Sequence, residues 1–92
     1  MSHDLMTTLA LTFPTLHQAP GVQPWKPAKL DQWACSPHPC CGARHAARFV
    51  LAVWNDHQNW RCGRFHLIEA MHTWDQAHVG ALCRWLSAPR FP

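Results

Sequence analysis

Several features that would assign a protein class are missing from this chain of 92 residues. No apolar run approaches the roughly 18–20 residues that a transmembrane helix needs, and no internal repeat is present. The apolar stretch over residues 5–13 follows Asp4, lacks Lys and Arg and contains three Thr, so it is a poor signal peptide. We therefore expect one cytoplasmic domain with no membrane association.

Charged residues are scarce as well, at 14% of the chain, and Tyr is absent, whereas hydrophobic residues make up 48%. This balance is typical of a globular protein and argues against a disordered one. Each large aromatic side chain buries roughly 150–250 Å². The six Trp and four Phe can therefore supply much of the core of so short a chain.

Catalytic motifs are missing too. The sequence has no Gly-rich phosphate loop and no nucleophile elbow. Cys62 has Asp56, His57 and His66 as sequence neighbours, but this proximity alone does not define a nucleophile and its base. A helical chain of this length also has little room for a cleft. We therefore predict that the protein is not an enzyme.

The odd number of cysteines, five, excludes a complete set of disulfides within one chain. In a reducing cytoplasm, cysteines indicate a metal site, a reactive thiol or simple packing. Five side chains that can ligate zinc occur within eleven residues: Cys35, His38, Cys40, Cys41 and His45.

Zinc takes four such ligands in a tetrahedron, and a loop that contains Pro and Gly can fold around an ion. The spacing matches no standard finger or ribbon, whose second ligand pair would have to be Cys62 and His66. Zinc bound at residues 35–45 is therefore one prediction, and free loop thiols are the alternative.

Helical periodicity is clearest over residues 43–55. A single stripe there holds apolar side chains three and four residues apart, and it should end near residues 55–57. A turn over residues 56–64 follows. The stripe consists of Ala46, Phe49, Val50, Val53 and Trp54.

Two further helices are predicted towards the C-terminus. A short one over residues 67–72 would face inward with Leu67, Ala70 and Met71. A longer one over residues 74–87 would start at Thr73, with Gln76 completing a capping box, and stop before Pro89. Its predicted buried stripe consists of Trp74, His78, Ala81, Leu82 and Trp85.

The N-terminal third is harder to predict. Residues 1–16 suit a strand or a helix, and their Thr residues favour the strand slightly. Residues 18–28 contain three Pro and a Gly, so they should form an extended linker that packs Trp25 on the domain. Ser36 and Pro37 suit the start of the next helix, although Pro39 and Gly42 disfavour a helix before residue 42.

The predicted fold is mostly α: a small three- to four-helix orthogonal bundle with an irregular or partly extended N-terminal arm. Residues 1–34 would be the arm and Pro-rich linker. Residues 35–88 would be the helical domain with a Cys- and His-rich entry loop. Residues 89–92 would be a tail.

Ionisable side chains also recur every three residues, at His66, Glu69, His72, Asp75 and His78. Steps of three residues wrap around a helix, so they do not line one face. We expect pairing between carboxylates and imidazoles three residues apart on a solvated face, with His78 in the core.

Positive charge is concentrated in the middle of the chain. Residues 26–64 carry six Lys or Arg against two Asp, hence +4, while the flanking segments carry −1 and 0. The arginines Arg44, Arg48, Arg61 and Arg64 could neutralise phosphates, and Trp60 could stack on a base. An ordinary solvated arginine face is the alternative.

The runs at residues 48–55 (RFVLAVWN) and 62–71 (CGRFHLIEAM) resemble an uncharacterised family of small proteins encoded on plasmids and integrative conjugative elements of proteobacteria. That family has similar runs, F-L-L-A-W-W-N and C-G-G-F-D-L, followed by a short and a longer helix. The resemblance covers about residues 44–87. Here Arg64 replaces a Gly and His66 an Asp, and the cysteine cluster has no counterpart.

The resemblance implies a mobile genetic element, where small helical proteins often bind and block a host complex. We therefore expect a non-enzymatic protein-binding module, an inhibitor of a host defence complex of the anti-CRISPR or anti-restriction type. Its partner would be a host or element-encoded protein, contacted through the four arginines and through Trp25, Trp33 or Trp60. The alternative is a small zinc-stabilised DNA-binding accessory or regulatory protein that uses the basic arginine face. DNA, RNA or a second copy of the chain are the other partners considered.

Overall fold

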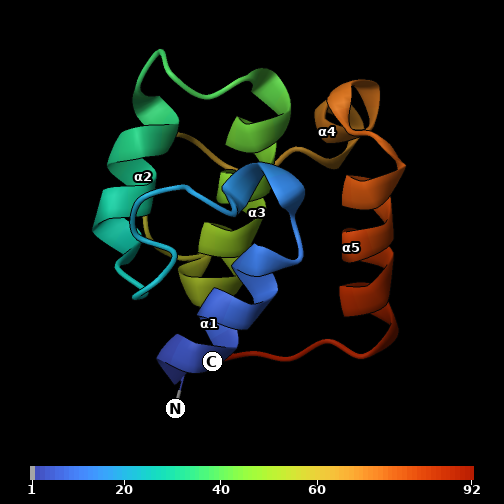
Figure 1. Cartoon of the computed structure of the whole chain (residues 1–92), viewed down its shortest axis with the longest axis horizontal. Coiled ribbons are helices and arrows are strands. Elements are labelled where there is room, and N and C mark those ends of the chain that lie inside the picture. The colour runs from blue at the N-terminus through green and yellow to red at the C-terminus, as the bar shows by residue number, and fades with distance from the viewer. Residues whose placement is uncertain (1) are drawn as a thin grey trace.

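The computed structural model describes residues 2–92, which contain five α-helices and one 3₁₀ turn (Figure 1). No strand occurs in this range, so the predicted mostly helical class is confirmed. No helix in it is both long and apolar enough to cross a membrane. The elements are α1 (Ser2–Leu11), η1 (Pro14–Leu16), α2 (Pro27–Cys35), α3 (Cys41–Asn55), α4 (Leu67–Thr73) and α5 (Gln76–Ser87).

The N-terminal third is not the irregular or extended arm that the sequence predicts. It forms α1, η1 and the turns that lead into α2, and these elements pack against α3. Pro27 stands in the first turn of α2, where a missing N–H costs no hydrogen bond. Eight residues of this segment are buried in the core: Met6, Leu9, Ala10, Phe13, Leu16, Ala19, Val22 and Trp25.

Helix α3 runs through the middle of the molecule and contacts α1, α2, η1 and α4 (Figure 1). It ends at Asn55, as its apolar stripe predicts, but it begins at Cys41, after Cys40 as N-cap. Ser36 instead ends α2, since its hydroxyl and its N–H both donate to the carbonyl of Trp33. The predicted start at Ser36 and Pro37 is therefore wrong.

Helices α4 and α5 follow the predicted order, with a different boundary. The N-cap of α5 is Asp75, whose Oδ1 accepts the N–H of His78 at 3.0 Å. The predicted cap, Thr73, instead ends α4 and donates its hydroxyl to the carbonyl of Ala70. Leu67 and Met71 do not face inward: they are 48% and 38% exposed.

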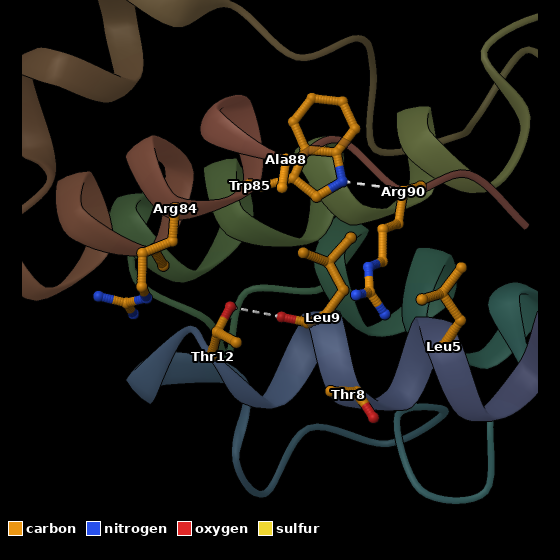
Figure 2. A pocket seen from close by; sticks show the side chains of 9 residues that line it. Leu5, Thr8, Leu9, Thr12, Arg84, Trp85, Ala88 and Arg90 are labelled. Carbon is orange, nitrogen blue, oxygen red and sulfur yellow. Dashed lines mark hydrogen bonds between the residues drawn. The ribbon is translucent and has the colours of Figure 1, made fainter.

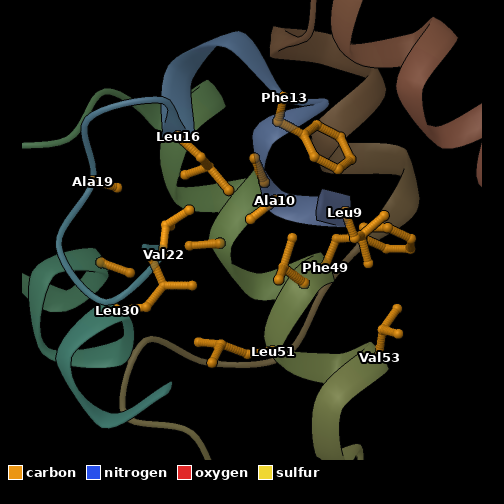
Figure 3. Packing of buried hydrophobic residues seen from close by; sticks show 14 of the residues in the cluster. Leu9, Ala10, Phe13, Leu16, Ala19, Val22, Leu30, Phe49, Leu51 and Val53 are labelled. Carbon is orange, nitrogen blue, oxygen red and sulfur yellow. The ribbon is translucent and has the colours of Figure 1, made fainter. Parts of the chain in front are cut away.

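Aromatic rings from distant parts of the chain meet in the core. Phe13 lies 5.7 Å from Phe49, 5.5 Å from Trp74 and 5.9 Å from His78, measured between ring centroids. Figure 3 shows Phe13 and Phe49 in this core, with Leu16 and Leu51 among the aliphatic side chains. The N-terminal segment is thus continuous with the core formed by α3 and α5.

Candidate functional site

Two of the four predicted contact arginines hold the backbone together. Arg44 donates from Nε to the carbonyl of Ala34 at 2.8 Å and from Nη2 to the carbonyl of Ser36 at 3.0 Å. Arg48 donates from Nε to the carbonyl of Cys62 at 2.6 Å. Both guanidinium groups donate hydrogen bonds to backbone carbonyls at or near the loops that flank α3. Sequence periodicity cannot distinguish this role from an exposed basic face.

The other two arginines, Arg61 and Arg64, are exposed. Arg64 lies 3.4 Å from Asp56, and both of these side chains are more than 60% exposed. Ion pairs in such surroundings contribute little stability. Of the four predicted arginines, Arg44 and Arg48 therefore bind the protein's own backbone, whereas Arg61 and Arg64 are solvated. Nucleic-acid binding stays a prediction.

The tryptophans predicted as anchors are largely used inside the molecule. Trp25 is 3% exposed and packs edge-on against Trp54 at 5.7 Å. Trp60 is half-buried and donates from Nε1 to the carbonyl of Asn55 at 3.0 Å, and Trp33 is half-buried too. Trp25 has almost no surface to offer a partner.

The predicted zinc ligands do not converge. Cys35, His38, Cys40 and Cys41 are exposed, whereas His45 is buried in α3. Within residues 2–92, no three His, Cys, Asp or Glu side chains lie close enough to hold a metal ion. Zinc therefore stays a prediction that a metal measurement on untagged protein decides: a content near zero per chain rejects it.

His45 is the unusual member of that set. It is 6% exposed, and its Nδ1 finds no hydrogen-bond partner among the described residues. Burial, together with the positive charge of Arg48, lowers the pKa of His45. The imidazole is thus held in the neutral form.

A small hollow lies between α1 and α5 (Figure 2). Its volume is about 230 Å³, smaller than the roughly 300–1,000 Å³ typical of small-molecule pockets. Leu5 and Leu9 of α1 and Trp85 of α5 line it with apolar surface. It is therefore suited to a single apolar side chain.

Two arginines flank this hollow. Arg84 and Arg90 lie on the two sides of Leu9 in Figure 2. Neither forms an ion pair within residues 2–92, and no acidic side chain of that range lines the hollow. The C-terminal segment is held in place because Trp85 donates from Nε1 to the carbonyl of Arg90 at 3.2 Å.

A second hollow, of about 440 Å³, lies where η1 and the starts of α3 and α5 meet. Three polar side chains are linked at its wall. His78 Nδ1 lies 2.7 Å from Asp75 Oδ1, and His78 Nε2 lies 2.8 Å from Thr15 Oγ1. The hydrogen bond from His78 lowers the pKa of Asp75, which keeps that carboxylate ionised.

The sequence predicts part of this second group. The pairing of Asp75 with His78, and the burial of His78, follow from their spacing on one helix. Thr15 gave no signal, because it stands 63 residues from His78 along the chain. The apolar hollow flanked by Arg84 and Arg90 gave none either, since α1 was not predicted to be part of the bundle.

Comparisons with protein-family models, curated proteins and solved structures find no match to this chain. Function therefore has to be argued from the two hollows and the surface around them.

Proposed function

We propose that the chain is a protein-binding module whose α1–α5 hollow receives an acidic, amphipathic segment of a partner protein. The observation that carries the proposal is an apolar hollow flanked by two arginines without ion pairs. Such a surface matches an apolar side chain next to a carboxylate. Arg and Trp are also the residues that most often dominate binding energy at interfaces.

The surroundings of the hollow favour the same kind of partner. Phe91 is 67% exposed, and its ring packs edge-on against Trp85 at 5.4 Å, which extends the apolar surface beyond the hollow. The chain carries a net charge of +3, which speeds encounter with an acidic partner. Binding of this kind needs no catalytic step.

The proposed partner is a protein encoded by the host or by a mobile element. The proposed role is inhibition of a host defence complex. Their support is the family resemblance of residues 44–87, and the hollow adds the recognition chemistry. The contact residues change accordingly. The proposed contacts move from Trp25, Arg44 and Arg48, which the fold uses itself, to Arg84, Arg90 and Trp85.

Affinity capture from a proteobacterial lysate tests the proposal. We expect the wild-type chain to retain a partner in stoichiometric amount, and the double variant Arg84→Ala/Arg90→Ala to lose it. Arg64→Ala is the matched control, because it removes an exposed arginine away from the hollow and should leave capture intact. Equal capture by the double variant and the control would show that the hollow is not the interface.

A further inference from the structure

We propose that Thr15, His78 and Asp75 form a nucleophilic site that accepts the acyl group of small carboxylic esters. The proposal concerns the second hollow, at the start of α3, and is independent of the binding role of the first. Its basis is a hydrogen-bonded sequence of hydroxyl, imidazole and carboxylate on the wall of one cavity.

The roles follow from what each group can donate. An ionised carboxylate only accepts hydrogen bonds, so the proton between Asp75 and His78 belongs to His78 Nδ1. In the neutral imidazole, Nε2 is then an acceptor, and the hydroxyl of Thr15 donates to it at 2.8 Å. Both distances lie in the range expected for a nucleophile with its base and for a base with its orienting group.

Packing keeps these groups aligned. His78 is 3% exposed, and its ring lies against Phe13 and Trp74 at centroid distances of 5.9 and 5.8 Å. Asp75 accepts both the ring Nδ1–H and the backbone N–H of His78. The same carboxylate therefore caps α5 and orients the imidazole. Rotation of the imidazole away from Thr15 would break both packing and hydrogen bonds.

The same hollow offers donors for negative charge. The first turn of α3 lines it with Cys41 and Gly42, and the first N–H groups of a helix have no acceptor within that helix. Cys40, the N-cap of α3, makes no capping hydrogen bond with its side chain. Trp74 fixes the turn by donating from Nε1 to the carbonyl of Gly42 at 2.9 Å. These N–H groups can stabilise an oxyanion.

The reaction proceeds by acyl transfer. Thr15 Oγ1 attacks the carbonyl carbon of the ester while His78 Nε2 takes the hydroxyl proton. The bond to the alcohol oxygen then breaks, and the alcohol leaves with the proton from His78, so that Thr15 carries the acyl group. Water repeats the step with His78 as base. The sum is one ester and one water converted to one acid and one alcohol.

An alkyl fluorophosphonate applied to the full chain tests the nucleophile directly. Thr15 Oγ1 would form the bond to phosphorus, the P–F bond would break, and fluoride and the hydroxyl proton would leave together. Peptide mass spectrometry should then locate a single label on Thr15. Thr15→Val should remove the label, whereas Thr12→Val should keep it, because the Thr12 hydroxyl donates to the carbonyl of Leu9 and lies at the other hollow.

The labelling rate tests the relay. We expect His78→Gln to lower it by about 100-fold, within the range that a general base contributes. Because His78 is buried, Asp75→Asn provides a second variant at an exposed position, with an expected loss of at least about tenfold. Melting curves report whether each variant is folded. Absence of a label on Thr15 of the wild type, or an unchanged rate in folded Asp75→Asn, overturns the proposal.

Discussion

Asp31 shows how one side chain joins two elements that periodicity treats as separate. It is 6% exposed and lies in α2. Its Oδ2 accepts the N–H of Arg61 at 3.0 Å, and its Oδ1 accepts the N–H of Cys62 at 2.9 Å. The buried carboxylate therefore accepts two backbone N–H groups of the turn that follows α3, which would otherwise lack acceptors.

We expect Asp31→Asn to destabilise the protein by about 2 kcal/mol, because an amide leaves one N–H of the turn facing another donor. Urea denaturation followed by circular dichroism measures the change. Asp56→Asn is the control, since that carboxylate is exposed and pairs with an exposed arginine, and it should leave the midpoint unchanged. Equal midpoints for the two variants would contradict the role assigned to Asp31.

Cys62 should react more slowly with thiol reagents than the other cysteines do. Burial, with the Asp31 carboxylate adding to it, raises the pKa of Cys62 to about 12, whereas the other four cysteines are exposed. The thiolate is the reactive form, so a raised pKa slows reaction at pH 8. We expect a disulfide reagent to titrate four thiols in the folded chain and the fifth only in denaturant. Five fast thiols would refute this.

At the scale of elements, the connection from η1 to α2 depends on one glycine. Gly21 has a φ of +83°, and a Cβ built there would lie 2.5 Å from the carbonyl oxygen of Lys26 and 2.6 Å from the N of Leu30. Both neighbours are backbone atoms, which cannot move aside as a flexible side chain would. The turn therefore requires a residue without a Cβ.

Gly21→Ala should lower the free energy of unfolding by at least about 1–2 kcal/mol, the cost of the left-handed conformation alone. The matched control is Gly42→Ala in α3, where a Cβ would meet its nearest atom, in Trp74, at 3.7 Å. It should be neutral or slightly stabilising. Thermal denaturation of both variants gives the comparison, and equal stability of the two would contradict the prediction.

The elements that the sequence predicts well are those with a long uninterrupted stripe. Spacing alone predicts four of the buried residues of α3, but it misses Ala47 and Leu51, which are fully buried. On α5 it predicts the buried residues His78, Ala81 and Leu82. Helix α1 was ambiguous because Thr favours strands, yet Thr7 here donates its hydroxyl to the carbonyl of Val22 at 2.6 Å. The prolines before α2 suggested a linker, although Pro27 opens a helix.

The candidate sites are less predictable for a related reason. Whether an arginine is free depends on which carbonyls lie within its reach, and Arg44 reaches a connection that spacing on α3 does not reveal. The exposed apolar face of α4 is another example. Leu67, Ala70 and Met71 all have inward spacing, but of the three only Ala70 is buried. A helix of seven residues has too little periodicity to distinguish these faces.

At the scale of the whole molecule, the described residues share one core, so the helices from α3 onward should not fold without the N-terminal segment. A fragment of residues 35–88 lacks Phe13, Leu16 and Leu30, all of which are fully buried in the full chain. We expect it to show no cooperative thermal transition and little dispersion in its proton NMR spectrum. A chain ending at Ala88 should keep the transition, because residues 89–92 are exposed. Cooperative unfolding of the fragment would contradict this and would show that the N-terminal segment is not required for the helical domain to fold.

The contacts of Phe13 also bear on how the protein is made. Its neighbours Trp74 and His78 come much later in the chain. A nascent chain that has presented α1 to α3 therefore still lacks the side chains that close over Phe13. The core around Phe13 should therefore close only after Trp74 and His78 have left the ribosome, and until then the apolar residues of α1 are available to chaperones.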